Sequence, residues 1–229
     1  MKVLLEIIQT ILGLFVGKKQ KMLTTKADYI PSEPQEDIEL TIEPIQVEFE
    51  PETNIVCNNH EVRIDWPDTV LWTEPGALIC KSNQYKTIAG NRAQSIDKIV
   101  VHWDGCLNSA QCAKVLGQRG LSAHFCIDND GTIHQLMDTN HVGWHARGVN
   151  SKSIGIEISN AVFTKYASKY SPKRPVAPAS TLHGKPFPAH LDFYKVQVDA
   201  LKELLKSLCG FYNVPLEFPN QNGELIRGV

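Results

Sequence analysis

The sequence lacks three features that would mark a specialised class of protein. Its formal net charge is only −2, so it has no basic excess of the kind that a bulk nucleic-acid binder needs. No apolar run reaches the ~20 residues that a membrane-spanning helix requires. Its six cysteines in 229 residues are too few for a scaffold built on disulfides. These absences indicate an ordinary globular protein with room for one good-sized domain and an appendage.

Lysine and arginine are absent from Asp28 to Glu61, a stretch that holds ten acidic residues and four prolines. Such a stretch repels itself, and proline blocks helices and central strands. We therefore expect residues 17–60 to form a mostly extended, acidic linker, with room for a short edge strand in the alternating segment 39–52. Residues 61–94 mix short apolar pieces with turn signals, and we interpret them as an irregular lead-in that decorates the following domain.

The N-terminus is strongly apolar, and its apolar residues recur at helical spacing along one stripe. No small-residue cleavage site follows, so no cleavable signal peptide is recognised. We expect an amphipathic helix over residues 1–16, with a lysine-rich segment after it. Such a helix can lie on a membrane surface, dock to a partner or pack on its own protein, and the sequence leaves these alternatives open.

Residues 95–229 show alternating strand and helix signals, which predict an α/β domain with a mostly buried sheet. A strand ends near His102, a helix begins at Asn108 or Ser109 and stops at Gly120, and a hairpin turns at residues 129–131. Later elements are an alternating strand (153–159), a long surface loop rich in Pro, Lys and Ser (165–190), and a helix (192–208) followed by Gly210.

Two residues stand out as candidates for chemistry. His102 lies at the end of a strand beside a glycine turn, although a lone histidine on a strand is more often a satisfied core residue. Glu157 lies in the middle of an isoleucine-rich strand, where an unpaired carboxylate is unfavourable. It either faces a small cavity beside Gly155 as a general base or forms a salt bridge to Lys152 or Arg147. With a zinc ion held by His102, the pair can perform metal-assisted amide hydrolysis.

Four ordered motifs carry a family resemblance: IVVHWDG, LSAHFCIDNDGTIHQL, HVGWHARGVNSKSIGIEISN and DFYKVQVDALKELL. Residues 95–218 resemble the zinc-dependent N-acetylmuramoyl-L-alanine amidases, which include phage endolysins, bacterial anhydromuropeptide amidases and animal peptidoglycan recognition proteins. Residues 160–200 are most similar to phage-type members. The resemblance implies a central mixed β-sheet flanked by helices, with Zn²⁺ in a groove. The residues before this region add an extended N-terminal appendage. It also implies hydrolysis of the amide between N-acetylmuramic acid and L-alanine, so the expected partners are peptidoglycan and muropeptides.

The resemblance assigns roles residue by residue. His102 matches a zinc ligand, and Glu157 matches the catalytic base of the bacterial branch. His145, in its Trp144-His145 motif, matches a histidine of the substrate groove, and His124 matches one that more often supports the site. Ala123 stands where other members have a catalytic tyrosine. Cys106 and Cys112 resemble a disulfide of the animal proteins, although a reduced pair fits equally well.

The family takes its second zinc histidine and a third Asp or Cys ligand from a segment after the late helix, whereas no histidine follows His190 here. We therefore expect the amidase-like domain to be truncated before its distal ligands. In the alternatives, His134, His183 or His190 substitutes, or the domain binds peptidoglycan without cutting it. The expected role is a phage lysin or cell-wall hydrolase acting in a virion or a host cell. A structural virion protein, with membrane or virion contact through residues 1–16, is the remaining alternative.

Overall fold

The computed structural model describes residues 53–182, 185–217, 220–221 and 224–225. The predicted helix over residues 1–16, residues 17–52 of the predicted linker and the predicted edge strand at 39–52 lie outside these residues. Among the described residues, no helix is long and apolar enough to cross a membrane.

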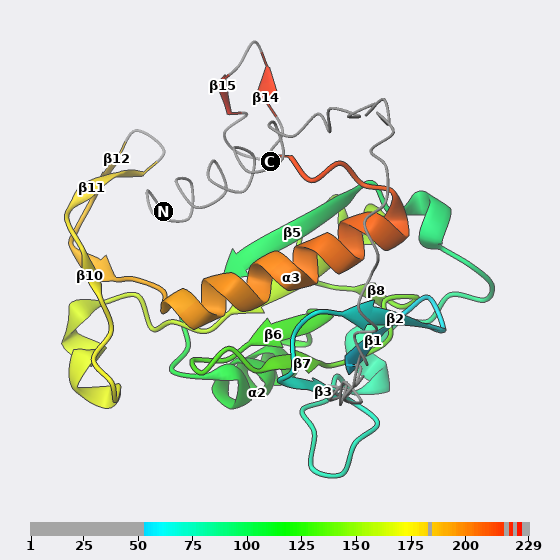
Figure 1. Cartoon of the computed structure of the whole chain (residues 1–229), viewed down its shortest axis with the longest axis horizontal. Coiled ribbons are helices and arrows are strands. Elements are labelled where there is room, and N and C mark those ends of the chain that lie inside the picture. Colours follow the sequence, from blue (N-terminus) through cyan, green and yellow to red (C-terminus); the bar gives the residue numbers. More distant parts are fainter. Residues whose placement is uncertain (1–52, 183–184, 218–219, 222–223, 226–229) are drawn as a thin grey trace, which may run out of the picture. The chain divides into compact units, whose positions relative to one another are not determined.

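The body of the fold is a five-stranded mixed sheet with the order β3-β7-β6-β9-β5 (Figure 1). Three neighbouring pairs are parallel, and β6 and β7 form an antiparallel hairpin. The strands are β3 (Thr69–Leu71), β5 (Lys98–Trp103), β6 (Phe125–Ile127), β7 (Ile133–Gln135) and β9 (Ser153–Ile158). The predicted α/β fold with a central mixed sheet is thereby confirmed.

β9 lies between β5 and β6, and all six of its residues are buried. Its isoleucines Ile154, Ile156 and Ile158 point to one face, as the alternation predicts, and each is at most 1% exposed. The opposite face of β9 carries Gly155 and Glu157, so a polar group lies inside the sheet layer.

Helix α2 (Ser109–Arg119) follows the predicted bounds because its end signals are local. The Asn108 side chain accepts a hydrogen bond from the Gln111 N–H, and Gly120 ends the helix in the left-handed conformation at φ 63°. Its buried Cys112 and Leu116 pack in the hydrophobic cluster that also contains Cys126 of β6. α2 therefore covers the sheet face from which Cys126 projects.

Helix α3 (Lys195–Tyr212) lies across the sheet in front of β5 and contacts both β5 and β6 (Figure 1). Its inward side is formed by Val198, Leu201, Leu204 and Leu208, which are buried, together with the half-buried Leu205. The predicted end before Gly210 was wrong. The helix continues because Tyr212 is buried, and it ends at Asn213 in the left-handed conformation.

Residues 53–95 contain regular secondary structure, although we expected them to be the end of the linker followed by an irregular lead-in. They form the hairpin of β1 (Thr53–Cys57) with β2 (His60–Ile64), the sheet strand β3, and β4 (Tyr85–Lys86), which pairs with β8 (Val142–Gly143). Two short 3₁₀ helices, at Ser82–Gln84 and Ala93–Ser95, complete the segment. The segment is thus part of the fold.

The predicted surface loop at 165–190 is largely exposed but carries short elements. A 3₁₀ helix (Thr164–Lys169) precedes two strand pairs, β10 (Val176–Ala177) with β13 (His190–Leu191) and β11 (Ser180–Leu182) with β12 (Lys185–Phe187). Another 3₁₀ helix spans Asn150–Lys152, and near the C-terminus β14 (Asn220–Gln221) pairs with β15 (Glu224–Leu225). Strands this short leave no periodic signal in a sequence.

Candidate active site

The register of the parallel strands β5 and β9 places His102 directly beside Glu157. On the other side of β9, Glu157 is paired in register with Cys126 of β6. Side chains at paired positions of neighbouring strands share a face of the sheet. The two residues singled out from the sequence are therefore neighbours on the face that α2 partly covers.

His145 comes to the same place from the loop that follows β8. Its ring lies against Gly155, where a Cβ atom would come within 2.5 Å of the ring's Cγ. The His145 Nδ1 atom is 3.1 Å from the Nε2 atom of His102. A glycine in the middle of β9 therefore creates the space in which the two imidazoles meet.

The hydrogen bonds around Ser153 determine the tautomer of His145. The Ser153 hydroxyl donates its single proton to the Val149 carbonyl at 2.9 Å, so it can only accept from the His145 Nε2 atom, 3.3 Å away. Burial, followed by the charge of His102, lowers the pKa of His145 to about 4, so the ring is neutral. Its Nδ1 lone pair consequently points toward His102.

His124 lies behind this pair and is completely buried. Its Nδ1 accepts the Gly155 N–H at 3.0 Å, which leaves Nε2–H to donate to the His141 carbonyl at 2.9 Å. Burial lowers the pKa of His124 well below its usual value, so it stays neutral. With both nitrogens engaged by the backbone, the fully buried His124 holds β9 against β6.

Trp144 is half-buried next to His145, and its backbone is fixed by Ser122. The Trp144 N–H donates to the Ser122 hydroxyl at 2.8 Å, and the Trp144 carbonyl accepts the Ser122 N–H at 3.3 Å. The Trp144-His145 pair is thus held in place from its backbone while the indole remains partly accessible.

Glu157 is 8% exposed, and burial raises the pKa of its carboxyl to about 8. The negative charge of Asp104 raises this pKa further, whereas the positive charge of Arg119 lowers it. No ion pair joins Glu157 to Lys152 or Arg147, all three of which lie in the described part of the chain. The salt-bridge alternative is therefore excluded, and Glu157 is a desolvated carboxyl group whose pKa lies close to neutral pH, in the range that suits a general base.

Asp104 is a site neighbour that sequence reasoning treated only as part of a turn. Its Oδ1 atom accepts the N–H groups of Cys106 and Asn160, and its Oδ2 atom accepts the Ser159 hydroxyl. Burial raises the pKa of Asp104 to about 6. Its position just beyond the strand that ends in the site was the signal that could have identified it.

The other histidines proposed as zinc ligands do not join His102. His134 lies 4.0 Å from Asp128, and the His190 Nδ1 atom lies 3.0 Å from the Pro188 carbonyl. His183 is outside the described residues. Within the described ranges, the one group of three ligand-type side chains with converging atoms is Asp104, Cys106 and Cys112, which does not include His102.

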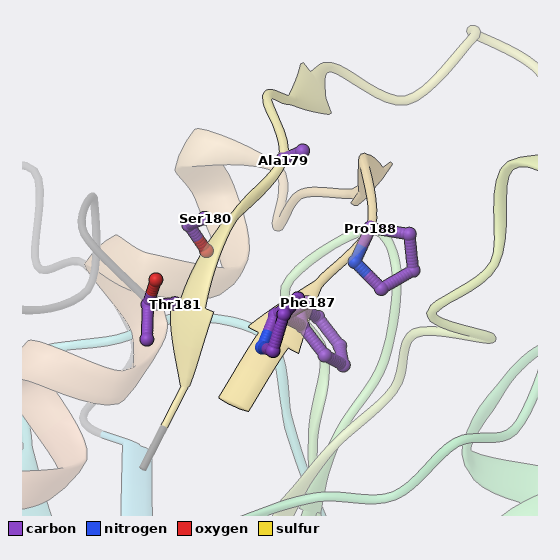
Figure 2. Close-up of a pocket in the computed structure, with 6 residues that line it drawn as sticks. Ala179, Ser180, Thr181, Phe187 and Pro188 are labelled. Carbon is purple, nitrogen blue, oxygen red and sulfur yellow. The ribbon is translucent and has the colours of Figure 1, made fainter. Parts of the chain in front are cut away.

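A shallow pocket lies on the β11–β12 hairpin (Figure 2). None of its lining side chains carries a titratable group, so the pocket has no residue that could act as an acid or a base. Phe187 of this hairpin also packs edge-on toward Trp103, the residue after His102, with ring centroids 6.4 Å apart. The lining residues are Ala179, Ser180, Thr181, Pro186, Phe187 and Pro188.

Among protein families, the model of the N-acetylmuramoyl-L-alanine amidases matches residues 92–221 of the chain. No curated protein matches the chain.

Three solved structures are similar to the chain, and two of them are named as N-acetylmuramoyl-L-alanine amidases. The first of these, the Escherichia coli AmiD complex with anhydro-N-acetylmuramic acid-L-Ala-D-gamma-Glu-L-Lys, is 20% identical, with a TM-score of 0.38 over 53% of this chain and 46% of that one. The second, the endolysin LysCS from Clostridium intestinale, is 20% identical, with a TM-score of 0.38 over 65% and 77%. AMPDH3 from Pseudomonas aeruginosa, in complex with anhydromuramic pentapeptide, is 25% identical, with a TM-score of 0.37 over 59% and 53%. The chain thus spans about half the length of AmiD and AMPDH3.

Proposed function

We propose that this chain, which belongs to the N-acetylmuramoyl-L-alanine amidase family, hydrolyses the amide between N-acetylmuramic acid and L-alanine in peptidoglycan. The single observation that carries the proposal is the register of β5 and β9, which sets His102 beside the desolvated carboxyl of Glu157. A metal-binding imidazole beside a buried base is the arrangement that water activation requires.

The imidazoles present fit zinc as two of its ligands. A catalytic zinc site takes three protein ligands with Zn–N bonds of about 2.1 Å, which sets two nitrogens about 3.4 Å apart on a tetrahedral ion. The facing nitrogens of His102 and His145 share a hydrogen bond at 3.1 Å, close to this spacing, in which the Nδ1 lone pair of His145 accepts. A third ligand for this pair is not found within the described residues. When bound, zinc lowers the pKa of its water and polarises the substrate carbonyl.

Glu157 acts as the proton acceptor in the proposed reaction. Its carboxylate takes a proton from the attacking water and delivers that proton to the departing amine of L-alanine, so the carboxylate is regenerated. Gly155 leaves room for the His145 ring next to β9, and Ser153 holds His145 in the required tautomer. Trp144 and His145 line the groove in which the muropeptide lies.

The test is the release of new amino termini from purified muropeptides supplied with Zn²⁺. We expect wild-type chain to release stem peptides that begin with L-alanine, and Glu157→Gln and His102→Ala each to lower turnover by at least about a hundredfold. Glu203→Gln, which alters a half-buried helix carboxylate paired with Lys206, is the matched control and should retain turnover. Undiminished turnover in Glu157→Gln would overturn the assignment.

A second candidate function is binding of peptidoglycan without cleavage. The observation that favours it is the absence of a third ligand for His102 and His145 among the described residues. It predicts that the chain sediments with insoluble peptidoglycan while no amino termini appear, even with excess Zn²⁺. Release of amino termini would exclude this function.

We further propose that the chain is a phage lysin or cell-wall hydrolase, supported by the similarity of residues 160–200 to phage-type members. Such a protein should lower the turbidity of cells whose wall has been made accessible. Cleavage of isolated muropeptides with no effect on whole walls would argue against this role.

A further inference from the structure

A second group of ligand-type side chains lies next to the amidase site and takes no part in the proposed reaction. One ligand atom each of Asp104, Cys106 and Cys112 lies within 4.8 Å of the others. Asp104 and Cys106 come from the loop after β5, and Cys112 comes from the first turns of α2. A third thiol adjoins the group, because the Sγ atoms of Cys112 and Cys126 are 3.9 Å apart.

The carboxylate of this group is held in place by hydrogen bonds. It accepts two backbone N–H groups and the Ser159 hydroxyl. An ionised carboxylate has about four acceptor positions, so these three hydrogen bonds leave one position for a cation. A cation would therefore find Asp104 already oriented.

We propose that Asp104, Cys106 and Cys112, with Cys126 as the fourth ligand, bind a thiophilic divalent cation such as Zn²⁺ at a site separate from His102. Thiolates select such cations over Mg²⁺ or Ca²⁺. Zn–S bonds of about 2.3 Å place two sulfurs about 3.8 Å apart on a tetrahedral ion. The Cys112–Cys126 separation of 3.9 Å matches that spacing before any ion is bound.

The burial of the three thiols and the partial exposure of Asp104 also suit a bound ion. Cys106, Cys112 and Cys126 are at most 7% exposed, so the thiolates would be shielded from oxidants. Asp104 is half-buried, so an ion can reach the group from the side of this carboxylate. Each thiol that becomes a ligand releases one proton to solvent, as metal binding to cysteine requires. An apolar core alone does not account for a carboxylate held against these sulfurs.

The test uses the full chain, reduced and kept under anaerobic conditions, with Co²⁺ as the probe. Thiolate ligation of Co²⁺ produces a charge-transfer absorption in the near ultraviolet, whereas imidazole ligation does not. We expect this band to saturate at about one Co²⁺ per chain, to disappear when Zn²⁺ is added, and to persist in His102→Ala. It should be lost in Cys112→Ser and retained in Cys209→Ser, which changes a buried thiol outside the group.

Asp104→Asn keeps every sulfur and the approximate shape of the side chain, so it tests the site even if Cys112→Ser does not fold. It should weaken Co²⁺ binding by about tenfold or more while the circular dichroism of the metal-free chain stays unchanged. The absence of a charge-transfer band in the wild-type chain would overturn the proposal. So would loss of the band in His102→Ala, or a Cys106–Cys112 disulfide that persists under reduction.

Discussion

Glu157 has an unusual protonation equilibrium, because its folded-state pKa of about 8 lies above the ordinary value of 4.5. A raised pKa means that the folded state holds the proton more tightly than the unfolded state does. The group's contribution to stability is therefore fully present below pH 4.5 and is lost as the pH rises through 8. In metal-free protein, we expect wild type to lose on the order of 3 kcal/mol relative to Glu157→Gln across this range.

Urea unfolding in the presence of a chelator at several pH values measures this difference. The carboxyl of Asp104, whose pKa is also raised, titrates in both proteins and contributes to both curves. The difference between the curves therefore reports mainly on Glu157. If the free energies of unfolding of wild type and Glu157→Gln differed by the same amount from pH 4.5 to 8, Glu157 would not be a buried carboxyl group without an ionic partner.

Gly155 allows the His145 ring to approach β9. In Gly155→Ala the added methyl group would come within 2.5 Å of the ring, so the imidazole must move away from His102. We expect a loss of stability of about 1 to 3 kcal/mol and a loss of muropeptide hydrolysis far greater than this destabilisation explains. Turnover assayed well below the melting temperature separates the two effects, and wild-type turnover in the variant would show that His145 is not needed near His102.

At the scale of elements, Gly210 lies inside helix α3 with nothing within 4 Å of the position that a Cβ atom would take. Glycine in a helix interior is about 1 kcal/mol less favourable than alanine. Gly210→Ala should therefore raise the free energy of unfolding by about 0.5 to 1 kcal/mol without changing activity. Chemical denaturation checks this, and the variant serves as the glycine-to-alanine control for Gly155. A destabilised Gly210→Ala would mean that the helix ends earlier than Tyr212.

The elements that sequence reasoning placed correctly are those with local signals. Asn108 and Gly120 mark the ends of α2 through their own hydrogen bond and backbone conformation, and the turn at Gly131 marks the β6–β7 hairpin. The end of α3 was missed because burial of Tyr212, whose hydroxyl contacts that of Thr139, outweighs the helix-stopping tendency of Gly210. That contact joins residues far apart in the chain, so no local pattern announces it.

The candidate site, like the fold, was predictable only where its signals are local. The positions of His102 and Glu157 followed from a strand end and from a charge in an apolar strand, and the strand register brought the two together. The contact of His145 with His102, the supporting position of His124 and the proximity of Asp104 depend on loop conformations. Loops carry no periodicity from which such distances could be inferred.

At the scale of the whole molecule, Gln135 joins the β1–β2 hairpin to the central sheet. Its fully buried side chain accepts the Val56 N–H at 2.8 Å and donates to the Val56 carbonyl at 2.6 Å and to the Met137 carbonyl at 3.1 Å. Gln135→Ala leaves both polar groups of Val56 without this partner. Because unsatisfied buried groups are unfavourable, we expect a loss on the order of 3 kcal/mol that is concentrated in the hairpin.

Hydrogen–deuterium exchange resolved by peptide measures where that loss falls. Protection should decrease over residues 53–64 in Gln135→Ala, whereas the amides of β5 and β9 should exchange as in wild type. Gln118→Ala, which removes an exposed glutamine from α2, is the matched control and should leave both regions unchanged. If the hairpin opens without affecting β5 and β9, residues 53–64 form a unit that can detach while the catalytic strands stay folded. Equal loss of protection in all regions would instead mean that the hairpin and the central sheet unfold as one cooperative body.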